Sequence, residues 1–465
     1  MKRSVLAPLA LAGSVAALFF SQIEIASSQF FGGGGSSGFN ASDPGVRGGA
    51  AGGGAAFTDL TANQAAFFAS GAADFASAEE VDEGLGPRMN LDSCGGCHIQ
   101  PALGGTSPFV NPQVAFASKD GGTDKVPSFI SANGPVREAR FVKNPDGTAD
   151  GGVHALFTIT GRTGATGCML TQPDFATQVA NHNVIFRIPT PTFGAGLIEM
   201  IPDGAIAANQ ASNSAQKTAL GIKGKPNFQV MGRTITGMTN NNGNDGTIAR
   251  FGWKAQNKSL LLFSGEAYNV EMGITNELFQ TEREENPNCQ FANVPNDTTN
   301  FDATTPVEVL GGIERFSNFM RFLDAPAPSA DTPGGATSIA NGRQKFADVG
   351  CALCHTLSFS TSKSTVAALS EKPVNLFSDL LVHDMGDGLA DGVSQGEAGP
   401  REFRTAPLWG LGQRIFFLHD GRTANLERAI REHSSNGSEA NGVINNFNNL
   451  GERSKQDVLN FLRSL

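Results

Sequence analysis

The sequence contains 465 residues, 40% of them hydrophobic, which is enough for two or three domains with buried cores. Its 34 basic and 44 acidic residues give a formal net charge of −10. No stretch forms a basic stripe, so nucleic acid is excluded as an expected partner, and the acidic excess is typical of a solvated surface.

The first 28 residues have the pattern of a secretory signal peptide. Lys2 and Arg3 precede an apolar run over residues 5–20, and small residues follow at positions 26–28. A membrane anchor is the alternative, but the run is short for a bilayer span and Gly-rich sequence follows it. No later segment is apolar enough to span a membrane. We therefore expect an exported protein, periplasmic or otherwise outside the cytoplasm, without a stable membrane span.

A Gly- and Ser-rich segment, residues 29–56, follows and predicts a flexible linker, so the folded part should begin near Phe57. The next residues, 61–76, are Ala-rich, with phenylalanines at roughly helical spacing. They predict a helix with Thr61 as its N-cap. A loop and then the pentapeptide Cys-Gly-Gly-Cys-His, residues 94–98, come after this helix.

The middle of the chain, about residues 100–320, is rich in Gly, Asn, Thr and Phe. Short β-favouring runs at 155–160 and 183–190 predict small strands. The composition indicates long ordered loops and a few short strands on a mainly α-helical frame.

The last part of the chain repeats the design of the first. A Pro-rich boundary at 324–335 precedes a predicted helix at 337–348, and a second pentapeptide, Cys-Ala-Leu-Cys-His, occupies residues 351–355. An amphipathic helix at 454–465, with Ser454 as a plausible cap, ends the chain. We expect an N-terminal domain over residues 57–330, with long insertions, and a compact C-terminal domain over 334–465.

The two pentapeptides use four of the six cysteines and two of the seven histidines. Cys-x-x-Cys-His is the pattern of c-type haem attachment, in which two thiols bind the porphyrin edge and the histidine binds the iron. A redox dithiol or half of a zinc site are the alternatives, but a dithiol leaves the repeated histidine unexplained. We therefore expect two covalently bound haems c, held by Cys94, Cys97 and His98 and by Cys351, Cys354 and His355.

Two cysteines are left, Cys168 and Cys289. In an oxidising compartment an even remainder favours one disulfide, and two buried free thiols are the alternative.

The second face of each haem iron decides the function, because a protein ligand there favours electron transfer and an open face permits peroxide chemistry. Residues 403–437, "FRTAPLWGLGQRIFFLHDGRTANLERAIREHSSNG", resemble the distal segment of the bacterial di-haem cytochrome c peroxidases and their relatives. These relatives include the methylamine dehydrogenase maturation enzyme, and the closest resemblance is to the di-haem oxidoreductases often labelled "thiol oxidoreductase". His433 stands where the peroxidases have Met, so the resemblance implies iron ligation by His355 and His433, with Met385 as the competing ligand.

A second segment, residues 249–279, resembles the part of the peroxidases that faces the first haem. The match implies that Trp253 lies between the haems and that Glu271, in "NVEMG", is the distal acid that moves a proton on bound peroxide. Glu199 is a reserve acid, and Trp409 is expected against the second haem. Two departures concern peroxidase activity more than haem binding. The Asp-Gly-Arg after the tryptophan is Lys-Ala-Gln here, and the expected Gln is replaced within "LLLF".

The resemblance implies a mainly α fold of two cytochrome c-like haem domains and a peroxidase-like oxidoreductase with one reactive and one electron-transfer haem. A small electron-donor protein of cytochrome or cupredoxin type, a small oxidant such as peroxide, and a homodimer are the implied partners. The alternatives are a non-catalytic di-haem electron carrier and an oxygenase or protein-modifying enzyme that uses high-valent iron. The family also binds calcium between its domains. Asp- and Asn-rich loops at 144–152, 240–246 and 384–392 are candidates, with plain turns as the alternative reading.

Overall fold

The computed structural model describes residues 39–228, 234–235, 238–239, 247–282 and 286–465. The predicted signal peptide (1–28), residues 29–38 of the predicted linker, and the Asn-rich loop 240–246 lie outside the described residues. Residues Asn40–Leu465 form one compact unit. The predicted division at residues 330–334 stays a prediction.

Helices hold 35% and strands 11% of the residues, so most residues lie in loops. The fold is therefore mixed, and the expectation of a mainly α protein was too strong. The physical reason is visible in the composition, because 57 glycines and 23 prolines interrupt helices throughout the chain.

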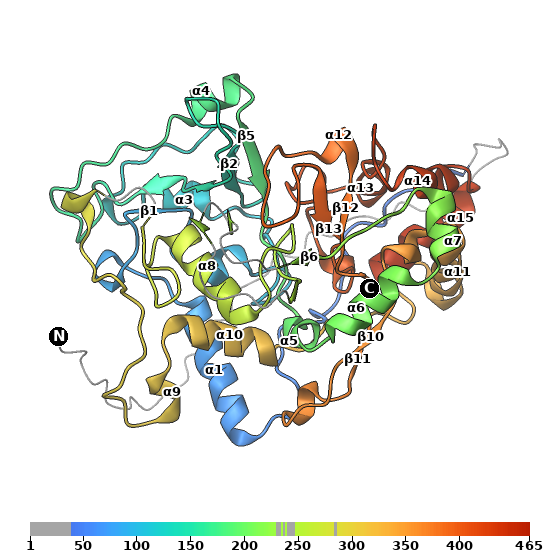
Figure 1. The fold of residues 1–465 in the computed structure, drawn as a ribbon, viewed down its shortest axis with the longest axis horizontal. Helices are drawn as coiled ribbons and strands as arrows, with labels where there is room; N and C mark the ends of the chain where they lie inside the picture. The colour runs from blue at the N-terminus through green and yellow to red at the C-terminus, as the bar shows by residue number, and fades with distance from the viewer. Residues whose placement is uncertain (1–38, 229–233, 236–237, 240–246, 283–285) are drawn as a thin grey trace, which may run out of the picture. The chain divides into compact units, whose positions relative to one another are not determined.

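Most helices are short, and the longer ones flank the two Cys motifs (Figure 1). The α-helices of the described residues are α1 (Ala62–Ala76), α2 (Cys94–Cys97), α3 (Gln113–Phe116), α4 (Phe175–Ala180), α5 (Ala195–Glu199), α6 (Asp203–Ala211), α7 (Ser214–Leu220), α8 (Leu260–Met272), α9 (Pro306–Val309), α10 (Gly312–Phe322), α11 (Gly335–Asp348), α12 (Gly386–Leu389), α13 (Leu426–Arg431), α14 (Asn441–Asn448) and α15 (Glu452–Ser464).

The strands form small antiparallel sheets. The largest has the order β3-β2-β5, with β2 (Glu138–Phe141), β3 (Val153–His154) and β5 (Val184–Arg187). The two-stranded sheets pair β1 (Arg88–Met89) with β4 (Phe157–Thr158), β6 (Asn227–Phe228) with β9 (Ile248–Ala249), β7 (Thr234–Ile235) with β8 (Met238–Thr239), β10 (Phe359–Ser360) with β11 (Pro373–Val374), and β12 (Val382–Asp384) with β13 (Glu402–Arg404). Strands β4 and β5 confirm the two β-favouring runs.

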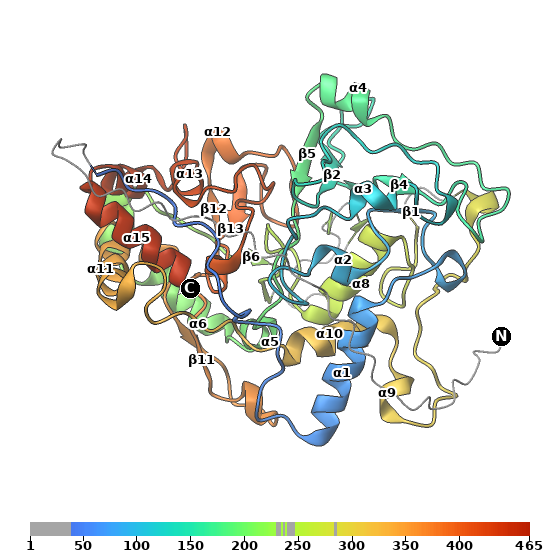
Figure 2. The ribbon, with the colours of Figure 1, turned by 180° about the vertical axis from the view of Figure 1, so that it is seen from behind.

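The helix before each Cys motif packs on a later helix, α1 on α10 and α11 on α15, and Figures 1 and 2 show each pair side by side from both directions. Each crossing depends on a glycine. A Cβ atom at Gly71 of α1 would overlap the main-chain oxygen of Arg315, and one at Gly342 of α11 would overlap that of Asp457. Side chains larger than hydrogen are therefore excluded from both crossings.

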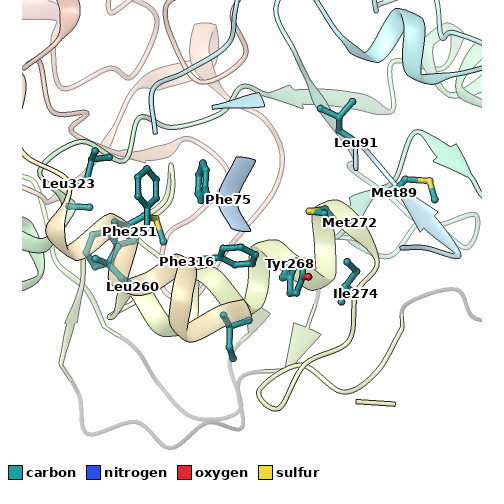
Figure 3. Close-up of a cluster of buried hydrophobic side chains, with 14 of the residues drawn as sticks. Phe75, Met89, Leu91, Phe251, Leu260, Tyr268, Met272, Ile274, Phe316 and Leu323 are labelled. Atoms are coloured by element: carbon teal, nitrogen blue, oxygen red, sulfur yellow. The ribbon is translucent and has the colours of Figure 1, made fainter. Parts of the chain in front are cut away.

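The buried hydrophobic side chains form two main clusters. The larger includes residues of α1, α8 and α10, and Figure 3 shows Phe75, Phe316 and Tyr268 within it. Phe316 meets the other two rings edge to face, at centroid distances of 6.2 and 5.0 Å. The second cluster lies within residues 346–465 and contains Phe346 and Phe461. Helix α8 is buried over most of its surface, which is why it shows no clear apolar stripe.

Three predicted features of the helices and the linker can be compared with the structure. Helix α1 begins after Thr61, whose side chain accepts a hydrogen bond from Gln64, as predicted. Helix α15 begins earlier than predicted, after Gly451 rather than Ser454, because Glu452 stabilises its first turn by pairing with Lys455. The folded part also begins earlier than Phe57.

Residues 40–56 are Gly-rich but lie in specific contacts with the rest of the chain. The Asp43 carboxylate accepts hydrogen bonds of 2.7 Å from Nε and Nη2 of Arg463, which is 1% exposed. The main-chain N–H of Arg47 donates to Gly412 at 2.7 Å. Composition predicts flexibility but does not reveal such long-range partners, so these residues are packed rather than a free linker.

Cys168 and Cys289 form a disulfide, which confirms the predicted pairing. None of the helices in the described ranges is long and apolar enough to cross a membrane.

Candidate functional site

The first Cys motif begins in the short helix α2. Ser93 caps this helix by accepting a hydrogen bond of 3.2 Å from the N–H of Gly96. His98 follows at the C-cap, and its Nδ1–H donates to the carbonyl oxygen of Gly105 at 3.0 Å. Burial lowers the pKa of His98 to about 4, so the ring is neutral at physiological pH. A neutral ring with Nδ1 occupied presents Nε2 as a metal ligand.

The second motif shows the same arrangement. Cys351 begins a 3₁₀ turn, Cys351–Leu353, and His355 follows it. The Nδ1–H of His355 donates to the carbonyl oxygen of Phe377 at 2.9 Å, and burial lowers the pKa of His355 to about 4. Both histidines are therefore held in the tautomer that metal-binding imidazoles adopt.

Each motif opens into a large cavity. The first comprises about 1160 Å³ of space outside the protein atoms and the second about 1350 Å³, part of it open to solvent. Both cavities carry a few polar groups among apolar side chains, which is the usual composition of a ligand pocket. The first is lined by Cys94, Cys97, His98, Trp253, Glu266 and Glu271. The second is lined by Cys351, Cys354, His355, Trp253, Met385 and His433.

The polar atoms of the first cavity fit an anionic macrocycle. Arg187 is fully buried there, and its Nε and Nη1 have no hydrogen-bond partner within the described part of the chain. An unpaired buried guanidinium N–H is costly, and carboxylates are its usual partners. The propionates of a haem supply such carboxylates, so the residues present fit the group.

Glu271 is one of a pair of carboxyl groups at this cavity. It is hydrogen-bonded to Glu138 of β2, and its Oε2 accepts a hydrogen bond of 2.8 Å from Asn90. Burial and the Glu138 charge raise the pKa of Glu271 well above its usual range. Burial acts on Glu138 in the same direction, but Arg140, which donates to it at 2.9 and 3.1 Å, and the bond to Glu271 lower its pKa. Glu271 therefore binds a proton more readily than Glu138 does.

Trp253 lines both cavities. Its Nε1–H donates to the carbonyl oxygen of Ile188 at 2.8 Å, which holds the indole in place. The ring meets His419 edge to face, at a centroid distance of 6.4 Å, and His419 stacks on Phe403 at 4.2 Å. These ring contacts thus connect Trp253, which lines both cavities, to His419 and Phe403, which line the second.

His433, after helix α13, lines the second cavity with His355. Its Nδ1–H donates to the carbonyl oxygen of Ala429 at 2.8 Å, the pattern of both motif histidines. Burial lowers the pKa of His433, and its charge affects His355, so the two rings are close. Met385 lines the same cavity, so position alone does not separate the two candidate ligands.

Two candidates from the sequence lie away from the cavities. Glu199 accepts hydrogen bonds from Arg321, the shortest at 2.7 Å, and from the N–H of Leu260 at the start of α8, which is a structural role. Trp409 belongs to the larger hydrophobic cluster, against Gly194, and does not line the second cavity. The expectation for Trp409 was wrong, because the chain turns it away from the motif that its sequence position suggested.

Sequence reasoning assigned no role to three residues of the first cavity and one of the second. Glu138 and Arg140 lie on a short strand with no motif around them, and only the fold brings them to α8. Glu266 had a signal, since a lone acid within the apolar run "SLLLFSGEAY" is unusual. At the second cavity His383 is buried between Asp379, at 3.0 Å, and Glu439, at 2.8 Å.

In the two candidate calcium loops that the structure describes, carboxylates already bind other residues of the chain. Asp146 accepts hydrogen bonds from Thr148, and Asp150 pairs with His154 at 2.8 Å. Asp384 and Asp387 both pair with Arg401. These contacts are those of turns and ion pairs. The third loop, 240–246, lies outside the described residues.

The fold thus contains two cavities, each lined by the cysteines and the histidine of one Cys-x-x-Cys-His motif. The sequence model of the family described as "Di-haem oxidoreductase, putative peroxidase" matches residues 145–465, more than half of the chain. The protein therefore belongs to the di-haem oxidoreductase family. The resemblance found in its distal segments is confirmed.

No curated protein matches the chain. Among solved structures it is similar to hydrazine synthase of Kuenenia stuttgartiensis under xenon pressure, with 16% identity, a TM-score of 0.24 and coverage of 44% of this chain and 60% of that one. It is also similar to a MauG-like protein associated with microbial copper homeostasis, with 20% identity, a TM-score of 0.25 and coverage of 35% and 55%. The chain spans little more than half of either structure, and at these TM-scores neither similarity carries an inference.

Proposed function

We propose that the protein is an exported di-haem c-type oxidoreductase that reduces peroxide. Cys94, Cys97 and His98 bind an open, reactive haem. Cys351, Cys354, His355 and His433 bind an electron-transfer haem. The observation that carries the proposal is the difference between the cavities. The first presents the hydrogen-bonded carboxyl pair of Glu138 and Glu271, and the second presents a second histidine, His433.

The state of the thiols supports covalent attachment over a redox dithiol. Burial raises the pKa of Cys94 and of Cys351 to about 12, whereas reactive dithiols have a lowered thiol pKa. Within the described residues, the second motif contributes one ligand, Cys354, to a group with Asp379 and His383, and these two are already hydrogen-bonded to each other. That arrangement does not favour a zinc site.

When bound, haem iron would supply the site at which peroxide coordinates and from which peroxide takes electrons. Glu271 holds a proton at this cavity and can move it between the two oxygens of the substrate. Glu138, kept anionic by Arg140, orients the Glu271 carboxyl through their hydrogen bond. Trp253 lies between the cavities, where it can assist electron transfer from the second site to the first.

The signal-like N-terminus and the Cys168–Cys289 disulfide support export, since disulfides persist in oxidising compartments. A small cytochrome or cupredoxin is the proposed electron donor, and a homodimer is the proposed assembly. Calcium is not part of the proposal, because Arg401 and local turns already use the carboxylates of the two described loops.

Absorption and electron paramagnetic resonance spectra of the purified ferric protein test this function. We expect two haems that survive denaturation, one high-spin and one low-spin, and turnover of hydrogen peroxide with a reduced donor. Two low-spin haems that do not respond to peroxide would indicate the electron-carrier alternative. A high-spin haem without peroxide turnover would favour a protein-modifying enzyme.

A further inference from the structure

The first cavity is lined by a third carboxylic acid besides the Glu138–Glu271 pair. Glu266 lies on α8 and is 3% exposed. Asn257 donates a hydrogen bond to its Oε2. Its Oε1 is buried and makes no hydrogen bond of good geometry in the described ranges, although Gln256 lies near enough to lower the pKa of Glu266. A buried carboxylate oxygen without a partner is costly, so its presence at a ligand cavity calls for a ligand.

An unpaired donor faces the same cavity. Nη1 of Arg140 is buried and lacks a partner within the described chain, although Nε and Nη2 of the same guanidinium are bound to Glu138. Residues that line the cavity thus carry unpaired buried donors, on Arg140 and Arg187, and unpaired buried oxygens, on Gln256, Ser264 and Glu266. A small molecule that both donates and accepts hydrogen bonds satisfies both, and hydrogen peroxide and water are such molecules.

The proposed reduction of peroxide consumes more than one proton. Reduction of peroxide breaks the O–O bond and forms two waters, consuming two protons and two electrons. The electrons come from the reduced donor protein, which is oxidised in two one-electron steps. Glu271 moves a proton from one peroxide oxygen to the other, and this transfer supplies neither of the two protons that are consumed. A separate group must therefore deliver protons from outside the Glu138–Glu271 pair.

We propose that Glu266 is a second catalytic acid of the first cavity, which binds peroxide through Oε1 and, after Glu271 has moved a proton to the departing oxygen, delivers one of the two protons with which the remaining oxygen becomes water. This inference rests on the proposed peroxidase function. Burial raises the pKa of Glu266 to about 7, while hydrogen bonds from Asn257 and Gln256 and the charge of Arg140 lower it and Glu138 raises it. Glu266 therefore exchanges its proton near neutral pH.

The test compares variants of the di-haem enzyme. Glu266→Gln should lower kcat for hydrogen peroxide about tenfold or more, the lower range for general acid catalysis, with unchanged haem spectra. The wild-type kcat should fall as pH rises through about 7, because only the protonated acid donates, and this dependence should be absent in the variant. Glu266→Asp, which keeps the carboxyl, should recover part of kcat and the pH dependence.

Glu79→Gln is the matched control. Burial raises the pKa of Glu79 to about 7 as well, and its Oε1 accepts a hydrogen bond of 2.9 Å from Tyr268, but Glu79 does not line the cavity. This variant should keep both kcat and the pH dependence. Infrared spectra of the ferric protein at pH 5 provide a readout other than activity. Glu266→Gln should remove the C=O band of a protonated carboxyl that Glu79→Gln leaves in place.

The outcomes are distinct. If the wild type turns over peroxide and Glu266→Gln retains kcat within twofold and the same pH dependence, the role of Glu266 is wrong and the peroxidase function stands. If Glu266→Asp behaves as Glu266→Gln, or the infrared band is unchanged, Glu266 is structural. If the wild type with both haems does not turn over peroxide, the proposed function fails and this inference fails with it.

Discussion

The two Cys-x-x-Cys-His modules have the same frame and different surroundings. In each, a glycine in the first helix allows a close crossing, and a phenylalanine four residues later lies near the motif histidine. Phe75 is 5.9 Å from His98, and Phe346 is 6.1 Å from His355, between ring centroids. The same phenylalanines contact the second helix of each pair, at 4.8 Å from Phe319 and 5.5 Å from Phe461.

What differs is the rest of each cavity. Strand β2 and helix α8 bring acids and arginines to the first cavity, and the segment after α13 brings His433 to the second. The comparison teaches that the same helix packing builds each Cys-x-x-Cys-His site, while residues from distant segments determine the chemistry that an iron bound there can perform. Four predictions test this difference, ordered from the largest expected effect.

Removal of the second histidine should make the second cavity resemble the first. His433→Gly is expected to convert the low-spin ferric haem of that site completely to high spin, because an axial ligand is lost. Electron paramagnetic resonance measures the change. Met385→Leu is the control and should leave the low-spin signal unchanged. If only the methionine variant changes the spectrum, Met385 is the ligand and the assignment of His433 is wrong.

Removal of the first cavity's acid should abolish its chemistry without affecting the second site. Glu271→Gln should lower kcat for peroxide by about 10²–10⁴-fold, as expected for the loss of a general acid–base group. Steady-state turnover of the di-haem protein provides the measurement. Glu199→Gln should retain kcat, since Glu199 anchors helices away from the cavity. The opposite result would make Glu199 the working acid.

Loss of the disulfide should destabilise the first module more than the second. Cys168 and Cys289 both belong to the larger cluster, which contains α1 and α10, and their bond closes a separation of 121 residues. The double substitution to Ala should lower the free energy of unfolding by about 2–5 kcal/mol. Urea titrations in which the absorption of each haem is followed separately report the unfolding of each module. An equal loss of unfolding free energy at both haems would show that the disulfide does not stabilise the first module more than the second.

The glycine crossings should respond alike in the two modules. Gly71→Ala and Gly342→Ala should each lower the free energy of unfolding by about 1–3 kcal/mol, because the added methyl overlaps a main-chain oxygen. Gly204 of α6 has no atom close to its absent Cβ, so Gly204→Ala is the control and should cause no loss. Thermal unfolding measures all three. If either crossing substitution left the free energy of unfolding unchanged, the helices would accommodate the added methyl group and the prediction would be wrong.

Much of the local structure could be predicted from the sequence. The capped helix α1, strands β4 and β5, and the Cys168–Cys289 bond follow from local patterns or from cysteine counting. The packing of residues 40–56 could not be predicted, since it depends on partners such as Arg463 that lie some 400 residues away. The first residue of α15 also escaped prediction, because its first turn is stabilised by an acid rather than by a capping serine.

The sequence by itself determined two repeated sites with thiols and a histidine at fixed spacing, since five consecutive residues carry that chemistry. It also marked Trp253, Glu271 and His433 as candidates. Only the tertiary structure brought Glu138 and Arg140 to Glu271, and Trp253 to both cavities, because these groups come from strands and helices far apart in the chain. Proton affinity depends on burial and neighbouring charge, and both arise from the packing of those distant segments.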